Sequence, residues 1–140
     1  MNKHWAEAWL GRPWVAGEHD CADFVVDVLR EQFDRALDLP AHAESGSGAP
    51  TGATVRGWDR QIAALKGDYA ELTASPRDGD GVLMVAKGAR RLRRYHLGLW
   101  AGIGGVAHVL HCQDGAGSIL HPIRDLGLRA LELEGIYRWR

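Results

Sequence analysis

The sequence contains no long hydrophobic run and no surplus of positive charge. No stretch approaches the roughly 18 to 20 consecutive apolar residues of a membrane-spanning helix, and residues 1–14 lack the uninterrupted apolar segment of a signal peptide. We therefore expect no membrane span and synthesis in the cytoplasm without an export signal. The net charge of −1 and a pI near 6.6 remove the electrostatic drive for nucleic-acid binding, so no nucleic-acid partner is expected.

Cysteine is also scarce, which limits the chemistry further. Two cysteines without a signal peptide argue against a disulfide scaffold and for reduced thiols. The segments His19-x-Cys21 and His108-x-x-His111-Cys112 offer metal-ligand side chains, but neither has a familiar zinc spacing, and no Cys-x-x-Cys is present. We expect no metal and no other cofactor, and a His/Cys metal-binding protein is the less favoured alternative.

What is present describes one globular domain over residues 1–140. The chain is 46% hydrophobic and 25% charged, and 140 residues suffice for a core that buries roughly 70% of the unfolded chain's surface. Residues 41–54 are rich in Gly, Ser, Ala and Pro without a period, which indicates an internal surface loop.

The hydrophobic period changes from helical to extended after Asp78-Gly79-Asp80-Gly81. Before this turn, apolar spacing predicts three helices, over residues 3–10, 21–35 and 55–67; the first buries Trp5, Ala8 and Trp9, and the third ends at Gly67. After the turn, alternation predicts strands over residues 82–86, 95–101, 106–112, 118–123 and 131–140. This order predicts an α+β fold, with helices on one face of an antiparallel meander of about five to six strands.

One cysteine stands at the start of the second predicted helix. Asp20 is the expected N-cap, and Cys21 follows at once. The first turn of a helix stabilises a thiolate by only about one pKa unit, so a nucleophilic Cys21 also needs a histidine to take its proton as a thiolate–imidazolium pair. The alternative is that Cys21 is a small buried hydrophobe, because it shares a helical face with Val25 and Val28.

Three histidines lie in two neighbouring predicted strands, separated by a glycine-rich turn. If a two-residue turn centres on Ile103-Gly104, His111 lies opposite His96 on one face, while His108 pairs with Leu99 and points away. A three-residue loop would shift the register and favour His108 instead. We prefer His111 as the residue that orients His96.

A basic segment, residues 87–94, carries five cations between two predicted strands. A solvated hairpin loop is the favoured interpretation, and a loop that contacts an anion is the alternative.

These residues together resemble the NlpC-type cell-wall cysteine peptidases, a compact papain-like family, and especially its short phage tail-associated members. Pro13–Gly17 followed by Asp20–Asp23 resembles the aromatic and glycine-rich segment that leads into the family's Asp-Cys-Ser-Gly. Asp78–Asp80 is similar to its Pro-Gly-Asp turn, His96–Trp100 to its His-Val-Gly-Ile-Tyr strand, and Leu110–Cys112 to the following Ile-His-Ala.

The resemblance implies a papain-like fold and a Cys–His–His triad in which Cys21 attacks, His96 is the general base and His111 orients His96. It implies Trp14 and Asp20 as substrate or oxyanion contacts. The implied substrate is bacterial peptidoglycan, cleaved in its peptide stem at γ-D-glutamyl–diamino acid bonds. The implied setting is a phage virion tail or the host cell wall, with tail-tip proteins as possible partners.

The sequence also departs from the family pattern. Ala22 and Asp23 replace the usual Ser and Gly after the cysteine, and Trp14 replaces a usual tyrosine, which removes a hydroxyl. These departures keep a second hypothesis open: a tail-tip or assembly protein that retains the fold and has lost the chemistry.

Overall fold

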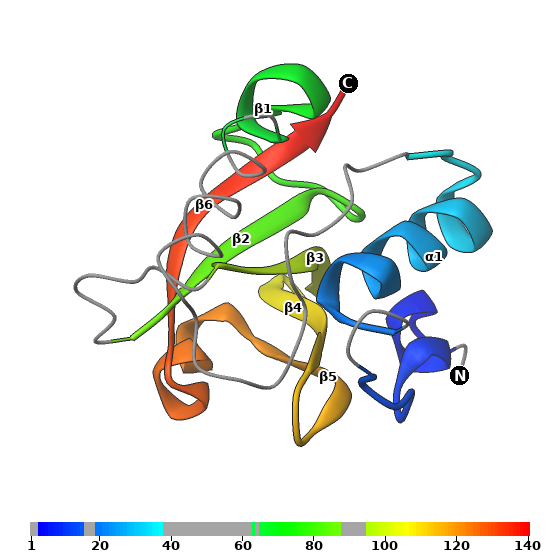
Figure 1. Ribbon diagram of the computed structural model, residues 1–140, viewed down its shortest axis with the longest axis vertical. Helices are drawn as coiled ribbons and strands as arrows, with labels where there is room; N and C mark the ends of the chain where they lie inside the picture. Colours follow the sequence, from blue (N-terminus) through cyan, green and yellow to red (C-terminus); the bar gives the residue numbers. More distant parts are fainter. Residues whose placement is uncertain (1–2, 16–18, 38–62, 64, 88–94) are drawn as a thin grey trace.

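The computed structural model describes the chain except residues 1–2, 16–18, 38–62, 64 and 88–94. Its centre is one six-stranded antiparallel sheet with the strand order β1-β6-β2-β3-β4-β5 (Figure 1). The strands are β1 (Ala70–Leu72), β2 (Gly81–Ala86), β3 (Tyr95–Ile103), β4 (Val106–Gln113), β5 (Gly117–Pro122) and β6 (Leu131–Trp139). The predicted α+β class and antiparallel sheet are therefore confirmed.

The sheet is a meander only in part. Strands β2 to β5 follow one another as predicted, but β6 returns across the sheet and pairs with β2, while β1 pairs with the outer edge of β6. The three-residue strand β1 was not predicted, because a segment of this length carries no alternation to detect. The return of β6 places the C-terminus beside the first strand (Figure 1).

Helix α1 spans Cys21–Phe33, and its start agrees with the prediction. The Asp20 side chain accepts from the backbone N–H groups of Ala22 and Asp23, and the Asp23 side chain accepts in return from the Asp20 N–H, which forms a capping box. The helix ends two residues earlier than predicted, because Asp34 adopts a left-handed conformation with φ of 51°.

The first two predicted helices pack on one face of the sheet, as expected, and a helical turn that was not predicted covers the other face. Helix α1 packs its apolar face on β3 and β4 (Figure 1). The helical turn η3 (Ile123–Arg129), which was not predicted, packs on the opposite face, where Leu126 joins Val82, Met84 and Val109. Burial on two faces explains why β2 is apolar almost throughout.

The N-terminal helix is a short 3₁₀ helix, η1 (Trp5–Trp9). It buries Ala6 and Trp9 and leaves Ala8 exposed, contrary to the face predicted from α-helical spacing. The reason is the period of three residues in a 3₁₀ helix, which brings positions i and i+3 into line.

The third predicted helix and the internal loop fall largely outside the described residues. Within them, the π-helical turn η2 (Leu65–Tyr69) continues past Gly67, so the prediction that Gly67 ends a helix is wrong. Residues 41–54 and the cations of the basic segment other than Lys87 lie outside the described part of the chain.

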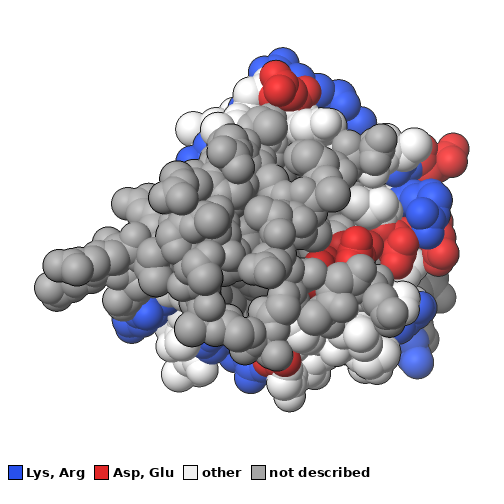
Figure 2. Space-filling view, viewed as in Figure 1, with Lys and Arg blue, Asp and Glu red and all other residues white. Residues whose placement is uncertain are grey.

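The described surface carries mixed charge. Around the edge of the face drawn in Figure 2, Lys and Arg side chains lie beside Asp and Glu side chains. On α1, for example, Arg30 pairs with Asp27 at 2.8 Å. Of the helices in the described residues, none is both long and apolar enough to cross a membrane.

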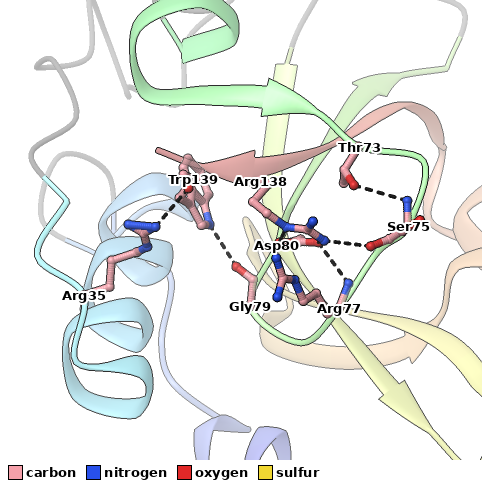
Figure 3. A network of polar contacts seen from close by, with 8 residues as sticks. All are labelled: Arg35, Thr73, Ser75, Arg77, Gly79, Asp80, Arg138 and Trp139. Atoms are coloured by element: carbon pink, nitrogen blue, oxygen red, sulfur yellow. Dashed lines mark hydrogen bonds and ion pairs between the residues drawn. The ribbon is translucent and has the colours of Figure 1, made fainter.

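A buried carboxylate joins the C-terminal strand to the turn before β2 (Figure 3). Asp80 accepts from the backbone N–H of Arg77 at 2.9 Å and from Nε and Nη2 of Arg138 at 3.3 and 3.0 Å. Beside it, Trp139 donates from Nε1 to the carbonyl of Gly79 at 2.8 Å. These bonds fix the end of β6 against the turn that precedes β2.

We expect Asp80→Asn to lower the free energy of unfolding by about 2 kcal/mol, because the charge-assisted bonds to Arg138 are weakened in a buried place. Urea unfolding followed by circular dichroism measures the change. The matched control is Glu71→Gln, which removes an exposed pair with Arg140 at 3.7 Å and should change stability by less than about 0.5 kcal/mol. Equal effects of the two substitutions would contradict the assignment.

Candidate active site

Cys21 is the first residue of α1 and packs, partly exposed, at the edge of the core beneath the helix. Its thiol lies beside the start of β3, since the backbone N–H of Leu97 acts on the thiol and favours the thiolate. The pairing of β3 with β4 begins only at Gly98 and His111, so the Leu97 N–H precedes this pairing and can reach the thiol. The sheet edge therefore brings the predicted nucleophile next to the residue that follows His96.

The first turn of α1 presents backbone donors close to the thiol, and the Ala22 N–H acts on it and favours the thiolate. The Asp20 side chain satisfies the N–H groups of Ala22 and Asp23, and the Asp20 carbonyl accepts from Phe24 at 3.0 Å. For the Cys21 N–H, the described residues supply no acceptor. A helix N-terminus of this kind can hold a developing negative charge.

His96 and His111 form a direct hydrogen bond. Nε2 of His96 lies 2.7 Å from Nδ1 of His111, with the two rings nearly perpendicular at 80°. His111 is fully buried, which fixes its ring in place. The structure thus brings together the two histidines that the sequence predicted as base and orienting residue.

The predicted register was wrong by two residues, although the predicted face was right. Ile103 pairs with Val106 across a Gly104-Gly105 turn, so His111 lies opposite Gly98 and not opposite His96. A shift of two residues keeps every side chain on its face. His96 and His111 therefore meet diagonally across the two strands.

Gly98 makes this diagonal contact possible. It stands directly opposite His111, and a Cβ atom built at Gly98 would lie 2.9 Å from the His111 Cβ and 2.9 Å from the Leu110 carbonyl oxygen. A glycine between the two histidines on their shared face leaves room for both rings.

His108 does not join the site. It pairs with Ala101, not with Leu99 as predicted, and lies on the opposite face of β4 from His111. Its Nδ1 is bonded to the carbonyl of Val106 at 3.0 Å. The alternative register that favoured His108 is therefore wrong.

The candidate metal ligands are not gathered at one point. His108 and His111 lie on opposite faces of β4, and the described residues contain no group of three or more His, Cys, Asp or Glu side chains arranged to hold a metal ion. Cys112 is buried, with Sγ 3.8 Å from the Pro13 carbonyl and 3.9 Å from that of His19, and both cysteines are free thiols.

The two further predicted contacts are placed near the helix start. Asp20 is buried, and its Oδ1 caps α1. Trp14 is half-buried against the core beneath α1, and the next residue, Val15, exchanges backbone hydrogen bonds of 3.0 and 2.8 Å with His19. This bridge holds the Trp14 segment beside the Cys21 turn, and the oxyanion and substrate roles of Trp14 and Asp20 stay predictions.

Burial makes the resting site neutral. It raises the pKa of the Cys21 thiol to about 12, with the Asp20 carboxylate adding to the rise, and lowers the pKa of His96 to about 4. Burial also lowers the pKa of His111 to about 2, and the neighbouring His96, His121 and Arg129 act in the same direction. These shifts oppose the thiolate–imidazolium pair expected from the sequence, and the described residues include no hydrogen bond between the Cys21 thiol and the His96 ring.

These shifts predict that stability falls as the pH is lowered from about 7 to about 5. In the unfolded chain these histidines bind protons near pH 6.5, whereas His96 and His111 in the folded protein stay neutral there. The free energy of unfolding is therefore highest above pH 6.5 and decreases as the pH falls toward the lower pKa values of the folded protein. Thermal unfolding at several pH values measures the slope. His111→Gln should flatten it and His108→Gln should not, and equal slopes for both would contradict the assignment.

A third histidine, which the sequence analysis missed, extends the site. Nε2 of His121 on β5 lies 2.8 Å from Nε2 of His111. The sequence did place His121 in a predicted strand, over residues 118–123. In the structure His121 pairs with Val109, and because residues 109 and 111 share a face, the His121 ring lies on the same face as His111. Recognising it required the register of the β4–β5 hairpin.

The fold and the site define an α+β protein with a cysteine at a helix N-terminus, beside the backbone of Leu97, and with three hydrogen-bonded histidines on an antiparallel sheet. No protein-family model matches the chain, and no curated protein matches its sequence.

Proposed function

We propose that this protein is a cysteine peptidase with a papain-like, NlpC-type fold that hydrolyses the peptide stem of bacterial peptidoglycan at γ-D-glutamyl–diamino acid bonds. The observation that carries the proposal is the 2.7 Å bond between His96 and His111, at the strand start whose Leu97 N–H acts on the Cys21 thiol. A nucleophile, a base and a residue that orients the base are the parts that acyl transfer to cysteine requires.

The reaction begins with proton transfer from the thiol of Cys21. His96 uses Nε2 for its bond to His111, which leaves Nδ1 to accept this proton as Sγ bonds to the scissile carbonyl carbon. The proton then passes to the leaving amine as the C–N bond breaks. Water, deprotonated by the same nitrogen, hydrolyses the thioester and restores the thiol.

The neutral resting pair is consistent with this sequence of steps. General-base contacts are often long before substrate binds and shorten in the complex, so the absence of a direct Cys21–His96 bond between described residues does not oppose it. In the intermediate, the Cys21 N–H would donate to the oxyanion, a contact whose loss typically costs 10²- to 10³-fold in rate.

A second candidate is a structural protein of the phage tail tip that keeps the fold without the chemistry. The observation that favours it is the desolvation of the Cys21 thiol, which raises its pKa to about 12. For either candidate, we propose that the protein acts in a phage tail or at the host cell wall.

The test is digestion of defined muropeptides, with products identified by mass. The peptidase proposal expects cleavage of the γ-D-glutamyl–diamino acid bond, and His111→Gln should slow it by about 10²-fold or more because the base loses its fixed orientation. The matched control, His108→Gln on the other face of β4, should stay within about threefold of the wild type. Intact muropeptides after incubation with the folded wild type would favour the structural protein.

A further inference from the structure

Three histidines from three neighbouring strands form one continuous chain of hydrogen bonds. His96 on β3 bonds to His111 on β4 at 2.7 Å, and His111 bonds through its other ring nitrogen to His121 on β5 at 2.8 Å. The rings meet edge to face at both contacts, with interplanar angles of 80° and 79°. Both nitrogens of the buried His111 are thus occupied by other imidazoles.

The far end of the chain is a carbonyl oxygen. Nδ1 of His121 lies 2.9 Å from the carbonyl of Pro122. A carbonyl can only accept, so this nitrogen must carry a hydrogen. In the neutral ring, Nε2 of His121 is then an acceptor, since a neutral imidazole has one N–H and one bare nitrogen.

This single constraint fixes the other two rings when all three are neutral. His111 must donate from Nε2 to His121 and therefore accepts at Nδ1. His96 must then donate from Nε2 to His111, and its Nδ1 is left bare. Burial supports this state, because it lowers the pKa of both His96 and His111 and keeps them neutral near pH 7.

We propose that His121 is a positioning residue that, through the Pro122 carbonyl, sets the tautomers of His111 and His96 and keeps Nδ1 of His96 bare to accept a proton. The catalytic consequence rests on the proposed function, whereas the tautomers do not. In a triad whose orienting residue can only accept a hydrogen bond, that residue alone decides which nitrogen of the base carries the hydrogen. An imidazole can donate or accept at either nitrogen, so His111 does not decide the tautomer of His96 until its own tautomer is set.

Protonation at the far end would reverse the chain. If His121 carried hydrogens on both nitrogens, His111 would accept at Nε2 and donate from Nδ1, and His96 would accept at Nε2 and hold its hydrogen on Nδ1. The base would then be blocked although no charge had reached it. Among the described residues, Asp20 from the helix cap acts on His96, and Arg129 from η3 acts on His111.

The first experiment is ¹⁵N NMR of the imidazole nitrogens in the intact wild-type protein near pH 7.5. We expect a bare, pyridine-type signal for Nδ1 of His96 and protonated, pyrrole-type signals for Nε2 of His96, Nε2 of His111 and Nδ1 of His121. A hydrogen on Nδ1 of His96 at this pH would overturn the proposal. This readout does not depend on catalysis or on a variant that folds.

The second experiment is the pH profile of Cys21 alkylation by iodoacetamide in folded variants. His121→Leu removes the acceptor and should slow alkylation about 10- to 100-fold at pH 7.5, as loss of an outer orienting partner commonly does. His121→Gln supplies an amide oxygen for the His111 N–H and should recover the rate to within about threefold. Equal rates and profiles for wild type, His121→Leu and His121→Gln would overturn the proposal.

The two experiments also separate this inference from the proposed function. The expected tautomers together with uncleaved muropeptides would support the histidine chain and refute the peptidase. Cleaved muropeptides together with a hydrogen on Nδ1 of His96 would support the peptidase and refute the role of His121.

Discussion

Replacing Cys21 with serine is expected to lower the rate of muropeptide cleavage by about 10⁴-fold or more while the fold stays intact. A hydroxyl is a far weaker nucleophile than a thiol when the base is matched to sulfur, and loss of a nucleophile from a triad typically removes most of the rate. The side chain is nearly isosteric and stands partly exposed at the first position of α1, so the substitution leaves the packing of the helix in place. Product masses over time, with a melting curve of each protein, measure both effects.

The matched control is Cys112→Ser. This second thiol is buried beneath α1 with backbone carbonyls around it, so a hydroxyl finds an acceptor there and the rate should stay within about threefold of the wild type. A Cys21→Ser protein that cleaves at the wild-type rate would refute the proposed mechanism. If Cys112→Ser instead abolished cleavage in a folded protein, the nucleophile would have been assigned to the wrong cysteine.

Gly98→Ala is expected to have the second largest effect, on stability and activity together. Its Cβ would lie 2.7 Å from Cγ2 of Val109 and 2.9 Å from both the His111 Cβ and the Leu110 carbonyl oxygen, and a backbone atom cannot move aside cheaply. Overpacking of this kind costs about 1 to 3 kcal/mol. Because His111 must shift, we also expect cleavage to slow by about 10²-fold.

Urea unfolding and muropeptide cleavage measure the two effects of Gly98→Ala. The matched control is Gly67→Ala, because a Cβ at that position meets no atom from other segments of the described chain within 4 Å, and both properties should stay close to those of the wild type. Wild-type stability and rate in Gly98→Ala would show that the space opposite His111 is not needed.

The predictable part of the site came from local patterns. The pair Asp20-Cys21 before an amphipathic run placed the thiol at a helix start, and alternation in β4 placed His111 and His108 on opposite faces. The register error lay in the choice of turn residues. A two-residue hairpin turn of type I′ needs positive φ at both central positions, and Gly104 and Gly105, with φ of 58° and 79°, meet this need better than Ile103 and Gly104.

Other features could not be reached in this way because they depend on contacts between distant segments. The return of β6 to pair with β2 and the packing of η3 on the second face are choices among several topologies that suit the same local pattern. His121 entered the site through two successive hairpin registers, each of which must be right before the third ring can be placed.

By itself, the sequence determined the class of fold, the helix start at Cys21 and the faces of His96, His108 and His111, since these follow from the periods of 3.6 and 2 and from capping within a few residues. Only the tertiary structure decided which atoms meet: the Leu97 N–H at the thiol, His111 opposite Gly98, and His121 at the end of the chain. It also decided the charge states, because desolvation depends on how the whole chain packs around a group and not on its neighbours in sequence.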